Sequence, residues 1–353
     1  MRLIEKVWFE GHQAKWWLVP LLLPLSLLFW CLSALRRFFF NVGIKSSIQV
    51  NCPIVIVGNI GVGGNGKTPV VLWLVKTLLQ QGIKVGVISR GYGGHAPHYP
   101  YLLTKESTAL EAGDEPVLIY QRCDIPVAVG ADRIAAANKL IEQGCQLIIS
   151  DDGLQHYRLK RDYELLVVDG KRYFGNGLLL PAGPLRETKQ RLNQVNQIII
   201  NGADEETVNS HIYSQTPIHN LMLKAEQVIN LKTGEAKTLA EFIDQHSCIN
   251  AIAGIGSPQR FFNYLNELGF IIEKQQGFID HQAYNEHLFS QIDSNDNPSA
   301  NHALVMTEKD AVKCKGFAKE HWWYLPVDAV FSSKESETII TEIVQLINQQ
   351  TKT

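Results

Sequence analysis

The sequence has few cysteines, and none of them is spaced for a paired-cysteine site. Its 353 residues include six cysteines, and no two of these form a Cys-x-x-Cys pair. This pattern argues against a disulfide framework and against a zinc site. Free thiols in a reducing compartment are the simpler interpretation. The sequence also has no internal repeat and no low-complexity segment, which argues against a repeat architecture.

Charged residues are scarce, at 19% of the chain, whereas hydrophobic residues make up 45%. This size and composition are sufficient for one large α/β domain and a smaller second one. The net charge of −2 is unevenly distributed: residues 1–50 carry six Lys or Arg and two Glu, while the rest carries 27 basic and 33 acidic residues. A basic N-terminal segment on an acidic body fits an anionic membrane surface better than nucleic acid.

One long run lacks charge altogether, and it lies near the N-terminus. Trp16 to Leu35 is 20 residues without a charge, or about 30 Å of helix, the thickness of the hydrocarbon core. Lys15 precedes the run, and Arg36 and Arg37 follow it on the side expected to be cytoplasmic. The run therefore predicts a membrane helix, although two prolines leave open whether it spans the bilayer or lies in the interface. The alternative is a buried core helix, although such runs are usually shorter.

A glycine-rich loop follows a short apolar strand. Ile54 to Val57 is typical of a buried parallel strand, and an apolar-rich helix is expected over Val70 to Leu79. Between them stands a match to G-x-x-x-x-G-K-[ST]. Backbone N–H groups of such a loop bind phosphate oxygens, and the following helix dipole adds positive charge. The predicted nucleotide site comprises Gly61, Val62, Gly63, Gly64, Asn65, Gly66, Lys67 and Thr68.

Within this loop, Lys67 would reach the β- and γ-phosphates and Thr68 would ligate Mg²⁺. A plain glycine-rich turn is the alternative. Val62 stands where membrane-targeting ATPases with a similar loop usually carry a second lysine, which disfavours that subtype.

Two carboxylates are candidates for the metal. Cys145 to Ser150 reads as a second buried strand, and Asp151 and Asp152 follow it directly. A carboxylate at the C-terminal tip of such a strand lies beside the P-loop and holds Mg²⁺ directly or through water. An Asp-Asp-Gly turn without a metal is the alternative interpretation.

Other polar clusters stand at the ends of predicted elements. Arg90 and Tyr92 lie in a glycine-rich loop after a strand, where they suit contact with substrate or phosphate. Asp114 precedes a helix, where it could cap the helix or act as a base. His281 lies in a loop and could pair with Asp114 across a cleft, although a lone histidine is more often structural.

A proline-rich loop supplies a further charged pair. Arg186 and Glu187 could serve a metal–phosphate site, or they could equally form a surface salt bridge.

The second half of the chain changes character after about residue 205. Two strands are expected over 219–225 and 227–231, and they suggest a two-stranded connector. Gly254-Ile255-Gly256 is a weak dinucleotide signal and is interpreted as a strand-to-helix turn.

We predict an α/β protein with a P-loop NTPase-like core, in which helices flank a parallel sheet. Its parts would be an N-terminal membrane helix (1–45), the core (46–215), a two-stranded linker (216–240), and a smaller α/β lobe whose C-terminal helix returns to the body (241–353).

Taken together, these motifs resemble the tetraacyldisaccharide 4'-kinase family, which acts in lipid A biosynthesis in Gram-negative bacteria. The resemblance runs from the membrane segment to about residue 330, in the family's order. The matching blocks are Gly58 to Pro69, Ser89 to Gly94, Gly113 to Pro116, Asp151 to His156, Gly175 to Gly177, Pro181 to Glu187, Gly254 to Phe262, Asp280-His281 and Thr307 to Lys313.

The resemblance implies transfer of the ATP γ-phosphate to the 4'-hydroxyl of a tetraacylated glucosamine disaccharide 1-phosphate, giving lipid IVA. It implies ATP as a substrate, Mg²⁺, and a catalytic body on the cytoplasmic face of the inner membrane. It also implies two α/β lobes joined by a two-stranded linker. No nucleic acid and no obligatory protein partner is expected.

Residue roles carry over position by position. Lys67 and Thr68 would hold phosphate and Mg²⁺, and Asp114, assisted by His281, resembles the family's base. The metal would be served by Asp151 and Asp152, with Arg186 and Glu187 nearby, and the glycine-rich loop would act through Arg90 and Tyr92. The sequence departs from the family pattern at Ile279, Gln282 and Ala283, which affects the expected pose of His281.

The main alternative is a membrane-tethered NTPase switch. Such a protein would hydrolyse nucleotide without a lipid acceptor and would need no pair between Asp114 and His281. A nucleotide-binding protein without turnover is disfavoured, because Lys67, Thr68 and two candidate metal carboxylates are all present.

Overall fold

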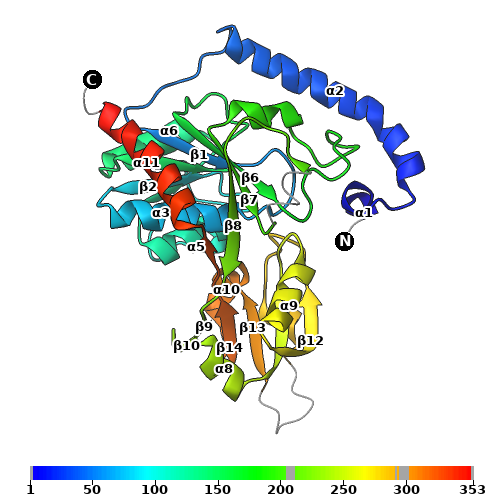
Figure 1. The fold of residues 1–353 in the computed structure, drawn as a ribbon. Helices are drawn as coiled ribbons and strands as arrows, with labels where there is room; N and C mark the ends of the chain where they lie inside the picture. The colour runs from blue at the N-terminus through cyan, green and yellow to red at the C-terminus, as the bar shows by residue number, and fades with distance from the viewer. Residues whose placement is uncertain (1–2, 204–210, 291, 294–301, 351–353) are drawn as a thin grey trace.

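The computed structural model describes residues 3–203, 211–290, 292–293 and 302–350. Its two β-sheets lie one beyond the other along the long dimension of the molecule, as Figure 1 shows. The helix α2 (Lys15–Asn41) lies on the outside of the larger lobe, and the short α1 (Leu3–Phe9) precedes it.

The larger sheet has nine strands in the order β15-β8-β7-β6-β1-β5-β2-β4-β3. The pairs from β8 to β4 are parallel, and only the edge strands β15 and β3 are antiparallel to their neighbours. The carboxyl ends of the parallel strands therefore meet at one edge, where α/β proteins bind ligands. The strands are β1 (Ile54–Gly58), β2 (Val85–Ser89), β3 (Tyr101–Leu102), β4 (Val127–Val129), β5 (Leu147–Asp151), β6 (Tyr163–Asp169), β7 (Gln197–Asn201), β8 (Ile218–Lys224) and β15 (Asp328–Val330).

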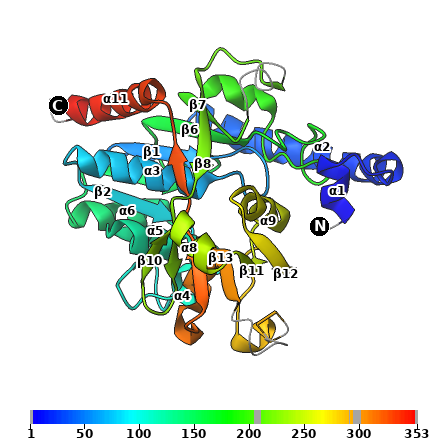
Figure 2. The ribbon, with the colours of Figure 1, turned by 60° about the horizontal axis from the view of Figure 1, so that its bottom comes forward.

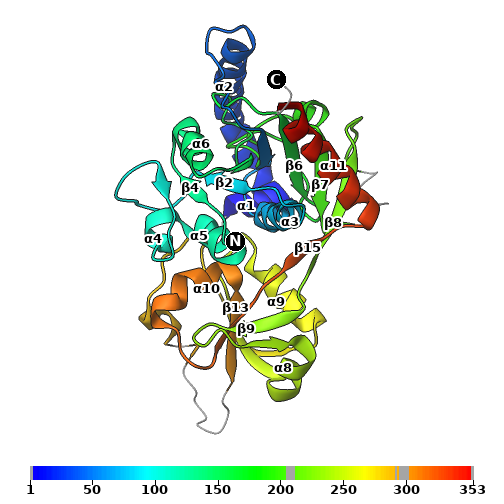
Figure 3. The ribbon, with the colours of Figure 1, turned by 90° about the vertical axis from the view of Figure 1, so that its left-hand side faces the viewer.

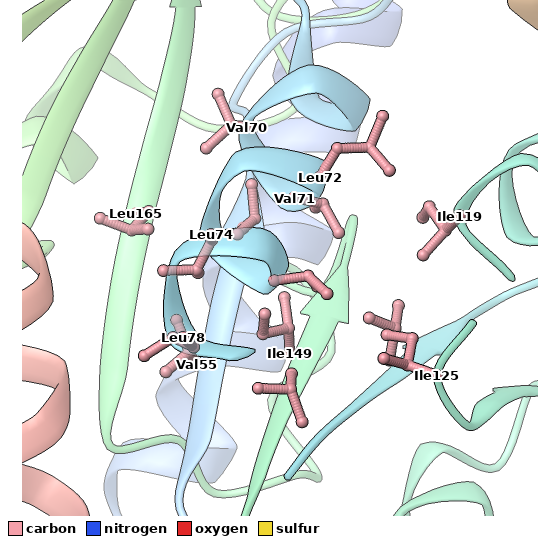
Figure 4. Packing of buried hydrophobic residues seen from close by; sticks show 14 of the residues in the cluster. Val55, Val70, Val71, Leu72, Leu74, Leu78, Ile119, Ile125, Ile149 and Leu165 are labelled. Carbon is pink, nitrogen blue, oxygen red and sulfur yellow. The ribbon is translucent and has the colours of Figure 1, made fainter. Parts of the chain in front are cut away.

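Both faces of this sheet are buried, which explains why its strands read as continuous apolar runs. In β1, Val55 and Val57 belong to one hydrophobic cluster while Ile54 and Ile56 belong to the cluster on the other face. Figure 4 shows helix α3 (Lys67–Gln80) on the first face, with its apolar side chains directed at the strands. The flanking helices include α4 (Ala109–Ala112), α5 (Asp114–Cys123) and α6 (Arg133–Glu142), with the 3₁₀ turn η1 (Lys189–Gln194).

The C-terminal helix α11 (Ser333–Gln350) packs on the larger lobe. Its buried Ile339 and Ile343 join the same hydrophobic cluster as α3. Figure 3 shows the two helices on the same side of the large sheet. The chain thus returns to the large lobe after it has completed the smaller one.

The smaller sheet has six strands in the order β10-β9-β14-β13-β11-β12. Its strands are β9 (Gln227–Asn230), β10 (Ala236–Thr238), β11 (Cys248–Ala253), β12 (Ile271–Gly277), β13 (Ala303–Thr307) and β14 (Trp322–Leu325). The four strands β12, β11, β13 and β14 are parallel. The helical elements are α8 (Leu239–Gln245), α9 (Pro258–Glu267), η2 (Glu286–Phe289), α10 (Glu308–Cys314) and η3 (Lys315–Phe317). Figure 2 shows this lobe turned toward the viewer.

The linker expected over residues 216–240 needs a correction. Both predicted strands form, as β8 and β9, but β8 belongs to the large sheet and β9 to the small one. The strand that pairs with β8 between the lobes is β15, more than 100 residues further along the chain. Pairing between such distant segments has no local sequence signal, whereas adjacency of two strand patterns does.

Helix α2 forms as expected and is longer than the uncharged run. It spans 27 residues and contains Pro20 and Pro24. By length and composition it can cross a membrane, since an 18-residue window within it has a mean hydropathy of 2.2. The alternative of a buried core helix is wrong, because large apolar side chains such as Trp16 (78% exposed) and Leu21 (66%) face outward.

Candidate active site

A cleft of about 1480 Å³ lies between the two lobes. Its large-lobe wall contains most of the residues that the sequence singled out, and the small lobe closes it from the other side. The lining residues from the predicted set are Gly63, Gly64, Asn65, Gly66, Lys67, Thr68, Arg90, Tyr92, Asp151, Asp152, Arg186, Glu187 and His281.

The phosphate loop connects β1 to α3, and the conformation of its last glycine disfavours any other residue. Gly66 has φ +81°, and a Cβ there would lie 2.1 Å from Asn201 Nδ2. The loop is also tied to the proline-rich loop, since the backbone N–H of Val62 donates to the carbonyl of Pro184 (2.9 Å). The loop lines the cleft at the start of a helix, where phosphate groups bind in proteins.

The cationic side chains around the loop converge on Asp152. Lys67 Nζ lies 3.5 Å from Asp152 Oδ1, and Arg186 Nη1 lies 3.0 Å from Oδ2. Burial opposes ionisation, but the charges of Lys67 and Arg186 lower the pKa of Asp152 below its ordinary value. The Asp-Asp-Gly turn does form, and it places this carboxylate beside the P-loop lysine.

Asp151 ends strand β5 and is only 1% exposed. Its Oδ1 atom is buried and has no hydrogen-bond partner among the described residues. Burial, reinforced by the charge of Glu115, raises the pKa of Asp151 to about 7. A buried carboxylate oxygen without a donor, in a cleft that Asp152 and Thr68 also line, offers the oxygen ligands that Mg²⁺ prefers.

Asp114 and His281 come together, although they belong to different lobes. His281 Nδ1 lies 3.0 Å from Asp114 Oδ1 and 3.1 Å from Oδ2. Gly113 occupies the N-cap position of α5, and Asp114, the first helical residue, also accepts a hydrogen bond from the backbone N–H of Glu115 (3.0 Å). Although burial opposes it, the hydrogen bond with His281 and the charge of Lys309 lower the pKa of Asp114. The same hydrogen bond raises the pKa of His281.

The glycine-rich loop after β2 carries the candidates Arg90 and Tyr92, and it places Tyr92 against His281. The ring of Tyr92 lies edge-on to His281, with centroids 5.0 Å apart. Tyr92 is 66% exposed, and Arg90 is also exposed at the cleft wall. Both side chains are therefore accessible to a ligand in the cleft.

Arg186 and Glu187 do not pair with each other, so the surface salt bridge considered above does not form. Arg186 bonds to Asp152, whereas Glu187 is 3% exposed and bonds to other groups. The two residues are linked through Gln155, which donates to Glu187 Oε1 (2.7 Å) and accepts from Arg186 (3.4 Å).

The comparisons with known proteins agree with one another. A family model described as "LpxK: Tetraacyldisaccharide-1-P 4'-kinase" matches residues 18–345. The chain belongs to the tetraacyldisaccharide-1-P 4'-kinase family. A curated relative from Colwellia psychrerythraea, named tetraacyldisaccharide 4'-kinase, is 58% identical over 340 residues, which cover 96% of each chain. One of the same name from Mannheimia succiniciproducens is 48% identical over 97% of this chain and 98% of its own.

A solved structure has the same fold. The crystal structure of LpxK from Aquifex aeolicus, described as in complex with ATP, superposes with a TM-score of 0.75 at 24% identity. The match covers 94% of this chain and 99% of the other. The P-loop NTPase-like arrangement with a second lobe is thus the fold of a tetraacyldisaccharide-1-P 4'-kinase.

One residue of this family member's site was not among the sequence candidates as an individual. Lys309 is the second residue of α10, and its Nζ lies 2.9 Å from Glu115 Oε1, 3.0 Å from Asp280 Oδ1 and 3.4 Å from His281 Nε2. Burial opposes it, but these carboxylates raise the pKa of Lys309. The block Thr307 to Lys313 was part of the resemblance, but only the folded chain shows which of its charges faces the cleft.

A second missed residue is Arg133, which is 3% exposed behind the site. Its guanidinium donates to the carbonyls of Ile88 (3.0 Å) and Asp151 (3.0 Å) and to Ser150 Oγ (3.2 Å). Burial lowers the pKa of Arg133 to about 10. The side chain joins the ends of β2 and β5, and nothing in its local sequence indicates that it turns inward.

Proposed function

We propose that this chain transfers the γ-phosphate of ATP to the 4'-hydroxyl of tetraacyldisaccharide 1-phosphate, giving the lipid A precursor lipid IVA. Family membership and the names of the curated relatives support the reaction. The relative solved in complex with ATP supports the donor. The observation that carries the proposal is the pair of Asp114 and His281, which joins the two lobes, with His281 lining the same cleft as the P-loop. A nucleotide switch has no need of such a pair.

At the donor end, residues 61–68 bind the phosphates and Lys67 neutralises the β- and γ-phosphates. Mg²⁺ fits the side chains of Thr68, Asp151 and Asp152, and it would supply neutralisation of the charge that develops on the phosphates. Arg186 lies beside Asp152 and adds positive charge at the same edge. Glu187 was also expected at the metal. Its two oxygens accept hydrogen bonds from Gln155 and Tyr157, so on this proposal it supports the metal site through these neighbours and is not a direct ligand.

At the acceptor end, Asp114 accepts the proton of the 4'-hydroxyl while His281 orients its carboxylate. The lowered pKa of Asp114 keeps it ionised at neutral pH. It is a weak base, which suffices because phosphoryl transfer passes through a loose transition state in which positioning and charge neutralisation dominate. Arg90 and Tyr92 lie where they can contact the sugar or its phosphate groups.

Helix α2 would hold the enzyme at the inner membrane with the catalytic body facing the cytoplasm. Its exposed apolar side chains and the basic residues that flank it support this orientation. The acyl chains of the substrate would stay in the bilayer while the sugar enters the cleft. On this proposal the working units are residues 1–45, 46–215 and 241–353, with β8 and β15 as the two strands that join the lobes.

The test is transfer of label from γ-labelled ATP to tetraacyldisaccharide 1-phosphate in detergent micelles, with Lys67→Ala and Asp114→Ala beside the wild type. We expect labelled lipid from the wild type and its loss in both variants. Release of free phosphate by the wild type without labelled lipid would contradict the proposal and would support the membrane-tethered NTPase switch.

A further inference from the structure

The buried carboxylate of Glu187 is held by side chains from three segments of the chain. Gln155 Nε2 donates to Oε1 (2.7 Å), and the hydroxyl of Tyr157 donates to Oε2 (3.0 Å). Arg191 Nε lies 3.5 Å from Oε2. The remaining contact comes from the membrane helix: Arg37 Nη1 lies 3.4 Å from Oε2, and the two side chains are 25% and 2% exposed. Arg37 therefore supplies charge to a carboxylate that water barely reaches.

Two other residues of the N-terminal segment form hydrogen bonds with the proline-rich loop that carries Glu187. Ser26 is the buried residue of α2, and its Oγ accepts from the backbone N–H of Ala182 (2.9 Å) and contacts the carbonyl of Leu179 (3.0 Å). In α1, Trp8 Nε1 donates to the carbonyl of Pro181 (3.1 Å). A hydrophobic anchor alone needs no such contacts, since apolar helices enter the bilayer on their apolar surface.

From Glu187 a short path of contacts leads to the phosphate site. Gln155 accepts a hydrogen bond from Arg186 (3.4 Å), which in turn bonds to Asp152 (3.0 Å). Asp152 then lies 3.5 Å from the P-loop lysine, Lys67. A shift of Glu187 would therefore move Gln155, whose Oε1 accepts from Arg186, and through Arg186 it would reach Asp152.

We propose that Arg37 is a positioning residue for phosphoryl transfer, acting through Glu187 to keep Gln155 and Arg186 in place at the phosphate edge of the cleft. The inference rests on the proposed kinase function. It makes the membrane helix part of the catalytic frame, so that detaching its basic end from the body lowers turnover even when the enzyme stays bound to lipid. Removing Arg37 takes away one of the two cations beside the buried Glu187 carboxylate and leaves Arg191, so Glu187 would shift toward its remaining partners.

The experiment compares Arg37→Ala with Lys45→Ala in the lipid-transfer assay. Both variants remove one positive charge near the end of α2, but the exposed Lys45 side chain contacts nothing at the site among the described residues. We expect Arg37→Ala to lower kcat about tenfold or more with little change in the KM for lipid, because the lost interaction acts on the transition state. Lys45→Ala should retain wild-type kcat. Equal effects of the two variants, or a change confined to the KM for lipid, would overturn the proposal in favour of a membrane contact.

Two further variants separate positioning from general damage to the fold. Arg37→Lys keeps the charge and should recover most of the lost kcat. The double variant Arg37→Ala/Glu187→Gln should be no slower than Glu187→Gln alone, because both changes break the same contact. Multiplicative losses in the double variant would contradict action through Glu187. If the wild type transfers no phosphate to lipid, the kinase function itself fails, and that result is distinct from a normal wild type beside an unaffected Arg37→Ala.

Discussion

The pKa values of Asp114 and His281 are shifted in opposite directions, because each residue stabilises the charged form of the other. Their hydrogen bond lowers the pKa of the carboxylic acid and raises that of the imidazole. The other ring nitrogen of His281 faces Lys309 Nζ at 3.4 Å and Asp280 Oδ1 at 3.8 Å. The histidine is thus placed between an acid that favours its protonation and an ammonium group that opposes it.

This pair predicts a pH-dependent contribution of His281 to stability. Because the folded-state pKa of His281 is raised, its contribution is fully present below the unfolded value of about 6.5 and is lost as the pH rises through the folded pKa. We expect His281→Ala to lower the thermal midpoint more at pH 6 than at pH 9. The measurement is thermal unfolding of both proteins in detergent at the two pH values. If the decrease in thermal midpoint caused by His281→Ala is larger at pH 9 than at pH 6, the imidazole is neutral when it binds Asp114, and the prediction is wrong.

At the scale of an element, the phosphate loop depends on one close approach. Gly66 is the N-cap residue of α3 and has a left-handed conformation beside Asn201 of β7, so Gly66→Ala combines backbone strain with a close contact to Asn201. Gly234 has a similar φ of +75° and nothing within 4 Å of its Cβ position. We expect Gly66→Ala to weaken ATP binding at least tenfold and Gly234→Ala to leave it unchanged. Both are checked by equilibrium binding of a fluorescent ATP analogue. Equal losses of ATP affinity in Gly66→Ala and Gly234→Ala would assign the effect to backbone strain alone.

Helix α2 predicts a membrane-binding phenotype. Leu21 and Leu28 are 66% and 55% exposed, which is costly in water and favourable in a bilayer. Exchanging both for lysine should move most of the enzyme from the membrane pellet to the supernatant, because each lysine costs about 3 kcal/mol at the centre of a bilayer. Fractionation of cell extracts with antibody detection measures the shift. An unchanged pellet fraction would place these side chains outside the apolar phase.

At the scale of the whole molecule, the contacts between the lobes include charged pairs, the packing of Val312 of α10 on the large-lobe core, and a tight backbone approach. Arg260 of α9 pairs with Asp169 at the end of β6, and Lys309 pairs with Glu115. A Cβ on Gly256, in the small lobe, would lie 3.0 Å from the backbone nitrogen of Gly64 in the phosphate loop. The Gly-Ile-Gly turn of the small lobe therefore forms part of the surroundings of the phosphate loop.

This contact predicts that Gly256→Ala disturbs nucleotide binding from the opposite lobe. The new methyl group would press on the phosphate loop, and we expect the KM for ATP to rise roughly three- to tenfold with little change in the thermal midpoint. Gly316→Ala is the control, since nothing lies within 4 Å of its Cβ position. The KM for ATP of both variants is measured by steady-state kinetics, with ATP varied at saturating lipid. If the KM for ATP is unchanged, the loop tolerates the displacement and the lobes are free to separate.

Much of the fold was predictable because its signals are local. The strand before the phosphate loop and the strand that ends at Asp151 carry continuous apolar runs, and both were expected within two residues of their observed ends. The partner of β8 was not predictable, because β15 has only three residues and lies far along the chain. The inward turn of Arg133 was equally hidden, since its neighbours are those of an ordinary helix start.

By itself the sequence determined the phosphate loop, the apolar helix and the strands that flank that loop, because glycine spacing, hydrophobic runs and turn residues act over a few positions. Only the tertiary structure decided which charges meet. The closing of two lobes brings His281 to Asp114 and Lys309 to Glu115, and the seating of α2 brings Arg37 to Glu187. These contacts join residues 150 or more positions apart, so they follow from how whole lobes pack and not from any local pattern.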